Sequence, residues 1–261
     1  MRILLIRHGD PDYEHDTLTE KGWREAGLLA QAAPSMGIDD CYLSPLGRAK
    51  DTALGSLKAM GKEARILDWL REFPAKADLG LSEELPKAYG HTSREDGEDR
   101  QSMMRDVVWD MVPAYWTNHP EFMETDGWRE SLVAQSGDVV PVYDRVCGEF
   151  DRLLEDYGYV RKDRLYRVVQ ENTKTIACYC HFGIICALLS HLWNVSPFIL
   201  WHGLALAPTS VTEIVSEERQ QGIASFRALR VGDLSHLWAG QEPPSFAARF
   251  CEVFSNREQR H

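Results

Sequence analysis

The sequence contains no long run of apolar residues. A membrane-spanning helix needs roughly 20 predominantly apolar residues in succession, and no stretch of this 261-residue chain approaches that length. At the N-terminus, only four strongly apolar residues separate Met1-Arg2 from Arg7, too few for the apolar core of a signal peptide. The sequence therefore predicts a cytoplasmic protein.

A disulfide framework is also missing. The six cysteines are scattered, at Cys41, Cys147, Cys178, Cys180, Cys186 and Cys251, without the spacing of a small secreted scaffold. The segment Cys178-Tyr179-Cys180-His181 would suit a metal cluster, but no second Cys/His pair stands at zinc spacing. We interpret these cysteines as small packing residues, and the sequence predicts neither a metal nor another cofactor.

An excess of positive charge is missing, since 29 Lys and Arg residues stand against 40 Asp and Glu residues. The net charge is −11 and there is no basic stripe, which argues against nucleic acid as a partner. A small phosphorylated substrate remains compatible with this charge, provided that a few Arg and His side chains make its pocket locally positive. With no membrane partner expected, the sequence is also compatible with a homodimer and leaves the oligomeric state open.

Internal repeats and low-complexity segments are absent as well. Apolar runs and alternation predict strands at residues 2–6, 39–43, 65–68, 165–170, 175–180, 209–215 and 226–231. Helices are expected from Thr19, a plausible N-cap, to about residue 34, from Ser44-Pro45 onward, and at 138–156 and 184–192. This alternation predicts a single α/β domain over residues 1–261, a three-layer sandwich whose mostly parallel central sheet is flanked by helices.

One segment, at about residues 76–136, departs from this pattern. It is rich in charge and in large apolar groups such as Trp109, Trp116 and Trp128, and it has little strand character. So many large apolar residues are too many for a disordered linker. We expect a largely helical, cap-like insertion, in which the acidic run at 94–99 is a solvated loop.

The most informative motif is Arg7-His8-Gly9, directly after the first predicted strand. A neutral imidazole can act as a nucleophile, and a guanidinium is shaped to hold a phosphate. Arg48, Glu72 and His181 also follow predicted strands. Because the carboxyl ends of parallel strands share one edge of a sheet, these residues can converge there.

Three motifs in this order resemble the histidine phosphatase superfamily, in its phosphoglycerate mutase-like branch 1. They are Arg7-His8-Gly9, the segment from Ser44 through Arg48 to Ala53, and His181-Phe182-Gly183. The segment from Leu18 to Ala26 is also similar to that family's first helix. The resemblance covers roughly residues 1–75 and 174–215 and leaves the insertion uncovered.

The resemblance implies a phosphohistidine mechanism. His8 would attack phosphorus, while Arg7, Arg48 and His181 would hold the phosphoryl oxygens, with the backbone N–H of Phe182 also available. Glu72 matches the family's usual position for the acid that protonates the leaving oxygen. Asp78, or an acid of the insertion such as Glu130, could share or take that role.

The first loop departs from the family pattern. Members commonly carry Glu-Thr or Glu-Ser after Arg-His-Gly, and then an Asn that touches phosphate. This chain has Asp10-Pro11-Asp12-Tyr13-Glu14-His15. The late motif also has one residue more than the usual His-Gly.

Three functions follow from these residues. The first is a phosphomonoester hydrolase of the histidine acid phosphatase type, which releases inorganic phosphate from a small metabolite or similar ester and needs no metal. A phosphoglycerate-type phosphomutase would share the first half-reaction. A non-catalytic phosphate-ligand-binding or scaffold protein of the same fold is the third, although such proteins usually lose a nucleophile or an Arg. The substrate is not identified by the sequence.

Overall fold

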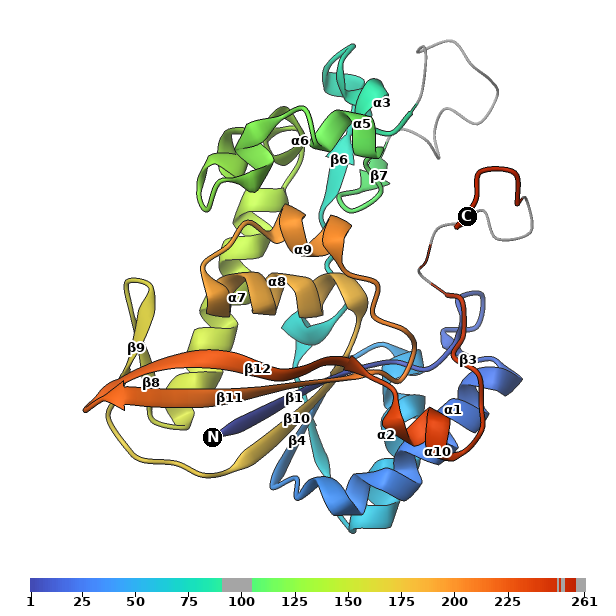
Figure 1. Cartoon of the computed structure of the whole chain (residues 1–261), viewed down its shortest axis with the longest axis vertical. Helices are drawn as coiled ribbons and strands as arrows, with labels where there is room; N and C mark the ends of the chain where they lie inside the picture. The colour runs from blue at the N-terminus through green and yellow to red at the C-terminus, as the bar shows by residue number, and fades with distance from the viewer. Residues whose placement is uncertain (91–104, 248, 250–251, 257–261) are drawn as a thin grey trace. The chain divides into compact units, whose positions relative to one another are not determined.

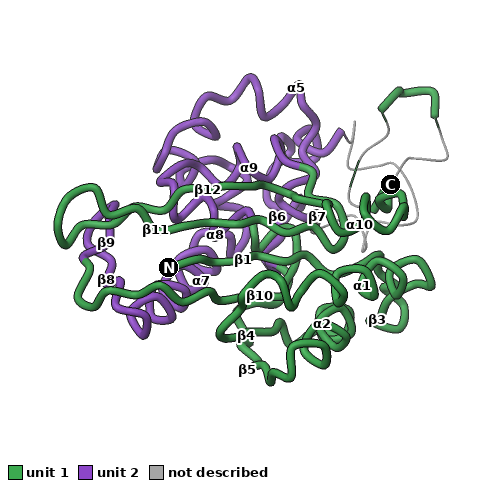
Figure 2. The backbone as a smooth tube through the Cα atoms, turned by 60° about the horizontal axis from the view of Figure 1, so that its bottom comes forward, with its two compact units in different colours: residues 1–72, 168–185, 205–261 green, residues 73–167, 186–204 purple. Residues whose placement is uncertain are grey.

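The chain divides into two compact units (Figure 2). The computed structural model describes residues 1–90, 105–247, 249 and 252–256. Unit 1 comprises residues 1–72, 168–185 and 205–261, and unit 2 comprises residues 73–167 and 186–204. The insertion predicted at 76–136 falls within unit 2, and the prediction of one domain with an insertion stays a prediction. The acidic run at 94–99 and Cys251 lie outside the described residues.

Unit 1 is built on a mixed sheet that is parallel in its core (Figure 1). The strands of this sheet that lie wholly in unit 1 are, in spatial order, β5 (Ala64–Ile66), β4 (Asp40–Leu43), β10 (Thr175–Cys180), β1 (Arg2–Arg7), β11 (Val211–Gln220) and β12 (Ile223–Asp233). The first four run parallel, whereas β11 and β12 are antiparallel to their neighbours. The predicted α/β fold with a mostly parallel sheet flanked by helices is confirmed.

The central strands β1 and β10 are mostly apolar because both of their faces are covered. Alternate residues of β1, such as Leu4 and Ile6, belong to one core cluster with Ala177 and Tyr179 of β10. Leu29 belongs to the same cluster and comes from helix α1 (Glu20–Ala32). The other set of β1 side chains is equally buried. Such two-sided burial is typical of parallel strands and holds the ends of β1 and β10 in a fixed place.

The start of α1 agrees with the prediction. Thr19 is the N-cap, and its side-chain oxygen accepts a hydrogen bond from the N–H of Gly22 at 3.1 Å. A short hairpin precedes it, formed by β2 (Pro11–Asp12) and β3 (Thr17–Leu18). Near the other end of unit 1, α10 (Ser235–Ala239) packs against α1.

The start of the next helix differs from the prediction. Helix α2 (Gly47–Met60) begins at Gly47 with Leu46 as N-cap, so Ser44 does not cap it and Pro45 is not its first residue. Ser44 directly follows β4, and its N–H donates to the carbonyl of Tyr179 at 2.9 Å. This bond extends the β4–β10 pairing by one residue and leaves the Ser44 side chain for another partner.

Unit 2 contains more strand than the sequence predicts. Its described helices are α3 (Leu85–Ala88), α5 (Pro113–Trp116), α6 (Leu132–Gln135), α7 (Val139–Asp156) and α9 (Pro197–Gly203). The strands are β6 (Lys76–Asp78), which pairs with β7 (Arg105–Val107), and β8 (Tyr159–Lys162) and β9 (Leu165–Val168) near the end of the unit. The prediction for α7 holds, and its apolar stripe is buried. Helix α8 (Phe182–Trp193) begins in unit 1 and continues into unit 2.

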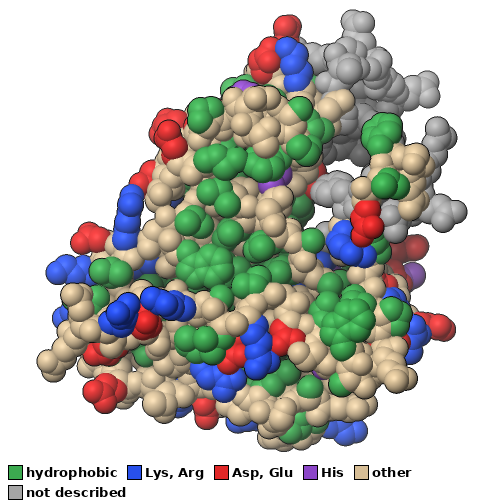
Figure 3. Space-filling model, in the orientation of Figure 1, with side chains coloured by type: hydrophobic (Ala, Val, Ile, Leu, Met, Phe, Trp, Pro, Cys, Tyr) green, Lys and Arg blue, Asp and Glu red, His purple; other side chains and the backbone are tan. Residues whose placement is uncertain are grey.

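The described surface carries charges of both signs. On the face shown in Figure 3, Lys and Arg side chains stand among Asp and Glu side chains. Within the described part of the chain, no helix is long and apolar enough to cross a membrane.

Candidate functional site

The carboxyl ends of three neighbouring parallel strands bring two imidazoles and a hydroxyl together in unit 1. Arg7, the last residue of β1, lies opposite Cys180, the last residue of β10. His8 and His181 therefore follow at the same edge, and the N–H of His8 donates to the carbonyl of Cys180 at 3.0 Å. The ring centroids of the two histidines are 5.1 Å apart. The sequence-predicted pair thus lies in one site.

His8 is held as a neutral ring with a defined tautomer. His8 is 1% exposed, and its Nδ1 lies 2.7 Å from the carbonyl oxygen of Gly9. Because a carbonyl can only accept, Nδ1 carries the proton, and the lone pair of the neutral ring resides on Nε2. Burial lowers the pKa of His8 well below its usual value, and the charges of Arg7 and Arg48 lower it further. The arrangement favours a nucleophilic Nε2 at neutral pH.

His181 is completely buried and lies against Ser44. Its Nε2 is 2.7 Å from Ser44 Oγ, which also accepts a hydrogen bond from the N–H of Leu46 at 3.2 Å. We assign the hydroxyl as the donor to His181 Nε2, which places the ring proton on Nδ1. Among the described residues, Nδ1 has no hydrogen-bond partner. A buried N–H donor without a partner is costly and suits an anion.

Burial also lowers the pKa of His181 well below its usual value. Electrostatic interactions with His8, Arg48 and Arg7 lower this pKa further. Both rings are therefore neutral at physiological pH. Two neutral imidazoles lie close together without the repulsion that two imidazolium ions would suffer.

Arg7 is buried beside the nucleophile and is oriented by backbone carbonyls. Its Nη1 donates to the carbonyl of Leu206, and also to that of Ala247 at 3.3 Å. The ring of Phe182, the first residue of α8, has its centroid 6.0 Å from Arg7 Cζ. Neither carbonyl has a sequence signature, because the backbone groups that hold Arg7 come from distant segments.

Arg48 lies in the first turn of α2, nearly buried at 9% exposure. Its Nη1 donates to Asp16 Oδ1 at 2.8 Å, and the ring of the exposed Tyr13 lies 5.3 Å from its Cζ. Both partners belong to the first loop. Arg48 thus joins that loop to the two histidines, whose pKa values its charge lowers.

Glu72 reaches the start of α8. It follows β5 and a short 3-10 helix, and its Oε1 accepts a hydrogen bond from the N–H of Ile184 at 3.3 Å. Glu72 also lies near enough to Cys180 for its charge to act on that thiol. Glu72 is half-buried. The residue that donates to its carboxylate, Ile184, is three positions after His181 in the sequence.

The two alternative acids belong to unit 2. Asp78 caps the 3-10 helix Leu79–Leu81, with its Oδ1 accepting from the N–H of Gly80 at 3.0 Å. Glu130 ends another short 3-10 helix, Gly127–Glu130. The structure therefore places only Glu72 of the three acids in the same unit as His8.

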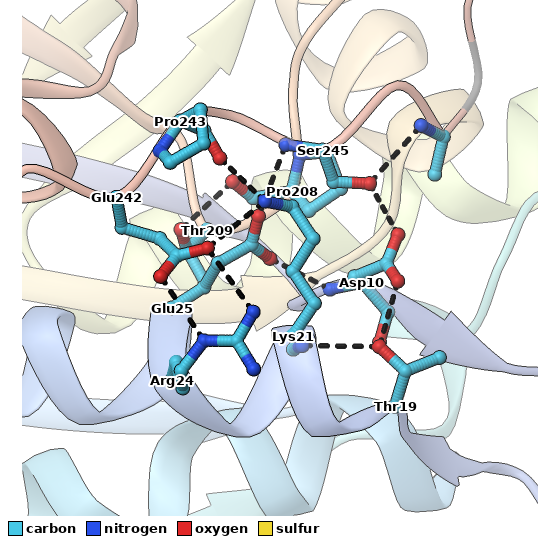
Figure 4. A network of polar contacts seen from close by, with 12 residues as sticks. Asp10, Thr19, Lys21, Arg24, Glu25, Pro208, Thr209, Glu242, Pro243 and Ser245 are labelled. Atoms are coloured by element: carbon cyan, nitrogen blue, oxygen red, sulfur yellow. Dashed lines mark hydrogen bonds and ion pairs between the residues drawn. The ribbon is translucent and has the colours of Figure 1, made fainter.

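A polar network beside the nucleophile was not predicted from the sequence (Figure 4). Glu25 of α1 is fully buried, and its two carboxylate oxygens accept hydrogen bonds from the N–H groups of Asp10 and Ser245, at 2.9 and 3.1 Å. The Asp10 carboxylate accepts from the hydroxyls of Thr19, at 2.7 Å, and Ser245. This network ties the loop after His8 to α1 and to the segment that reaches Ala247.

Burial raises the pKa of Glu25 to about 7, although both backbone N–H groups act in the opposite direction. The one sequence signal for the network is Gly22. A Cβ at this position would lie 2.2 Å from the carbonyl oxygen of Asp10, so glycine lets the loop approach α1.

Within the described residues, no group of three or more His, Cys, Asp or Glu side chains has a geometry that could hold a metal ion. The five described cysteines are all buried, and none of them is assigned to a disulfide. Cys178, Cys180 and Cys186 are fully enclosed in the core.

Residues 3–108 match the family model of the histidine phosphatase superfamily (branch 1). A curated relative, a probable phosphoglycerate mutase from Cronobacter sakazakii (strain ATCC BAA-894), is 32% identical over 92 residues, which is 32% of this chain and 41% of the relative. The match therefore spans about two fifths of that relative's length. These findings confirm the resemblance predicted from the three motifs.

Solved structures with the same fold include phosphatases and a mutase. A mycobacterial glucosyl-3-phosphoglycerate phosphatase with inorganic phosphate is 19% identical, with a TM-score of 0.56, covering 90% of this chain and 98% of that one. A phosphoserine phosphatase from Entamoeba histolytica is 20% identical (TM-score 0.54, 90% and 98% covered). A phosphoglycerate mutase from Bacillus anthracis str. Sterne is 21% identical (TM-score 0.55, 92% and 96% covered). At these identities the likeness concerns the fold.

Proposed function

We propose that this chain, whose residues 3–108 match the histidine phosphatase superfamily, hydrolyses phosphate monoesters through a phosphohistidine formed on His8. The observation that carries the proposal is the buried pair of neutral imidazoles, with His8 Nδ1 bound to Gly9 and its lone pair on Nε2. Phosphoryl transfer requires positioning and charge stabilisation more than covalent chemistry by the protein, and the two nearby guanidiniums of Arg7 and Arg48 supply the charge.

In the first step, His8 Nε2 attacks phosphorus, the P–N bond forms, and the ester P–O bond breaks. The leaving oxygen takes a proton, for which we propose Glu72 as the donor. Arg7, Arg48 and the Nδ1–H of His181 stabilise the negative charge on the phosphoryl oxygens, and the N–H of Phe182 at the start of α8 adds to this stabilisation.

In the second step, a water molecule attacks phosphorus and the P–N bond breaks. Glu72, now ionised, accepts a proton from this water, so that the carboxyl group returns to its starting state. Inorganic phosphate leaves and His8 is neutral again. The proposed cycle uses side chains and water alone, so the activity should survive a chelator.

Hydrolysis is favoured over the mutase reaction by the first loop and by the residues assigned to unit 2. The first loop lacks the Glu-Thr or Glu-Ser and the following Asn that are common in the family, the central segment at about residues 76–136 does not look like that of a mutase, and a mutase must keep water from its phosphoenzyme. The similar structures include phosphatases and a mutase. The experiment must therefore decide whether water or a second substrate accepts the phosphoryl group.

The test is a phosphate-release assay with a chromogenic phosphate ester. A second assay traps the labelled phosphoenzyme and identifies it as phosphohistidine by the loss of the label in acid. We expect turnover and trapping in the wild type, loss of both in His8→Ala, and retention of both in His15→Ala, a change at an exposed histidine of the same unit. Phosphoryl exchange between phosphoglycerates without net phosphate release would instead identify a mutase. A protein that binds phosphate but never becomes labelled would be the non-catalytic alternative.

A further inference from the structure

The carboxylate of Asp16, in the first loop, forms two hydrogen bonds with the start of α2. Its Oδ2 accepts a hydrogen bond from the N–H of Gly47 at 2.6 Å, and its Oδ1 accepts from Arg48 Nη1 at 2.8 Å. Both oxygens are thus directed at the first turn of one helix, although Asp16 is more than 30 residues away along the chain. This carboxylate binds the helix end and the arginine side chain together.

The backbone is shaped for this contact. Asp16 has a φ of +48°, in the left-handed region that non-glycine residues rarely adopt. At Gly47, a Cβ would lie 2.0 Å from the carbonyl oxygen of Asp16, so only glycine permits the approach. Leu46, the N-cap of α2, has no side-chain cap. Asp16, which is remote in sequence, therefore supplies the hydrogen-bond acceptor that the N-cap residue of α2 does not provide.

The same carboxylate determines where the Arg48 guanidinium lies. One terminal nitrogen of Arg48 is engaged by Asp16, while the charge of the group reaches His8 and His181. Arg48 Nε is buried without a hydrogen-bond partner among the described residues. The guanidinium is therefore fixed at Nη1, while its Nε–H still lacks an acceptor. This arrangement is preorganised for an anion between Arg48 and the two imidazoles.

We propose that Asp16 is a positioning residue for phosphate recognition: it fixes the guanidinium of Arg48 toward the His8–His181 pair. This inference rests on the proposed function for the identity of the ligand. It does not require turnover, because binding of inorganic phosphate depends on the same guanidinium. Removal of Asp16 should weaken phosphate binding through Arg48, whereas a carboxylate that merely caps α2 would act on stability alone.

The experiment measures binding of inorganic phosphate by calorimetry in the wild type, Asp16→Ala, Arg48→Ala and the double variant. Charge-assisted pairs are among the stronger hydrogen bonds, so we expect Asp16→Ala to weaken phosphate binding by about tenfold. In the Arg48→Ala background, Asp16→Ala should have little further effect, because the two residues act through one contact. Wild-type affinity in Asp16→Ala, or additive effects in the double variant, would overturn the proposal.

Two further variants keep the test decisive if Asp16→Ala folds poorly. Asp16→Asn retains one acceptor oxygen and should show a smaller loss of phosphate affinity than Asp16→Ala, with a raised KM for the chromogenic ester and a nearly unchanged kcat. Asp12→Asn is the matched control, since the Asp12 carboxylate contacts Glu14 and His15 within the loop. Affinity in Asp16→Asn equal to that of the control would contradict the proposal, and phosphate binding without any ester turnover would contradict only the proposed function.

Discussion

The imidazole rings of His8 and His181 lie 5.1 Å apart, with their planes inclined by 54°. Burial and the two arginine charges hold both rings neutral, as the lowered pKa of each shows. One ring keeps a lone pair on Nε2, and the other presents a proton on Nδ1. Both rings thus carry the proton on Nδ1, but Gly9 engages Nδ1 of His8 whereas Ser44 engages Nε2 of His181, so the same residue type supplies a nucleophile at one position and a hydrogen-bond donor at the other.

Removal of the Arg48 charge should shift the pH dependence of the reaction. Arg48 lowers the pKa of His8, so Arg48→Ala is expected to raise that pKa toward the ordinary value of 6.5, although burial still lowers it. A larger fraction of His8 is then protonated, and not nucleophilic, in mildly acidic solution. The acid limb of kcat/KM should therefore move to higher pH.

This shift is measured from about pH 4 to pH 8 with one ester, whose own phosphate titrates near pH 6 equally for both proteins. Arg65→Ala, at an exposed position on β5, is the matched control. An acid limb at the same pH in wild type and Arg48→Ala would show that Arg48 does not act on the pKa of His8.

Loss of the Ser44 hydroxyl should allow the His181 ring to exchange between its two neutral tautomers. Ser44→Ala removes the donor to His181 Nε2 and leaves the N–H of Leu46 without its acceptor. Buried unsatisfied groups cost about 1–3 kcal/mol each, so we expect a drop in stability of that order and a fall in kcat of about tenfold.

Nitrogen NMR of the His181 ring separates the two effects of Ser44→Ala. In the wild type, the proton is expected on Nδ1, whereas in the variant it should redistribute toward Nε2. Ser35→Ala, at an exposed serine, is the control. A ring that keeps its proton on Nδ1 in Ser44→Ala would contradict the assignment of the hydroxyl as donor.

The sequence predicts the carboxyl ends of β1, β4 and β10 to within one residue because these ends depend on local patterns. Residues 3–6 and 176–180 are continuously apolar, and a parallel pairing of such strands leaves His8 and His181 at one edge. Ser44 was misplaced because a Ser-Pro pair is also a good helix start, and the true start depends on Gly47 meeting Asp16.

Contacts between distant segments could not be predicted in this way. The carbonyls of Leu206 and Ala247 hold Arg7, yet a carbonyl is common to every residue and carries no signal. The pairing of Glu25 with Ser245 spans 220 positions. Only the three-dimensional approach of these segments, permitted by Gly22, determines that this glutamate is buried.

Burial of Glu25 should make stability fall as pH rises. Its pKa is raised from 4.5 to about 7, so between these values the folded chain holds a proton that the unfolded chain has lost. Stability conferred by the protonated carboxyl is therefore lost as pH rises, by at most about 1.4 kcal/mol per pH unit. Asp10 and Lys21 are the charged neighbours that modulate this titration.

The buried histidines act in the opposite direction, since their lowered pKa values make stability rise with pH. Comparison of the wild type with Glu25→Gln cancels this contribution, because both proteins retain His8 and His181. Urea denaturation at about pH 5 and pH 7.5 should show the wild type losing stability relative to Glu25→Gln as pH rises. Glu20→Gln, at an exposed position on the same helix, is the control. A difference between the two proteins that stays constant with pH would mean that Glu25 does not titrate in this window.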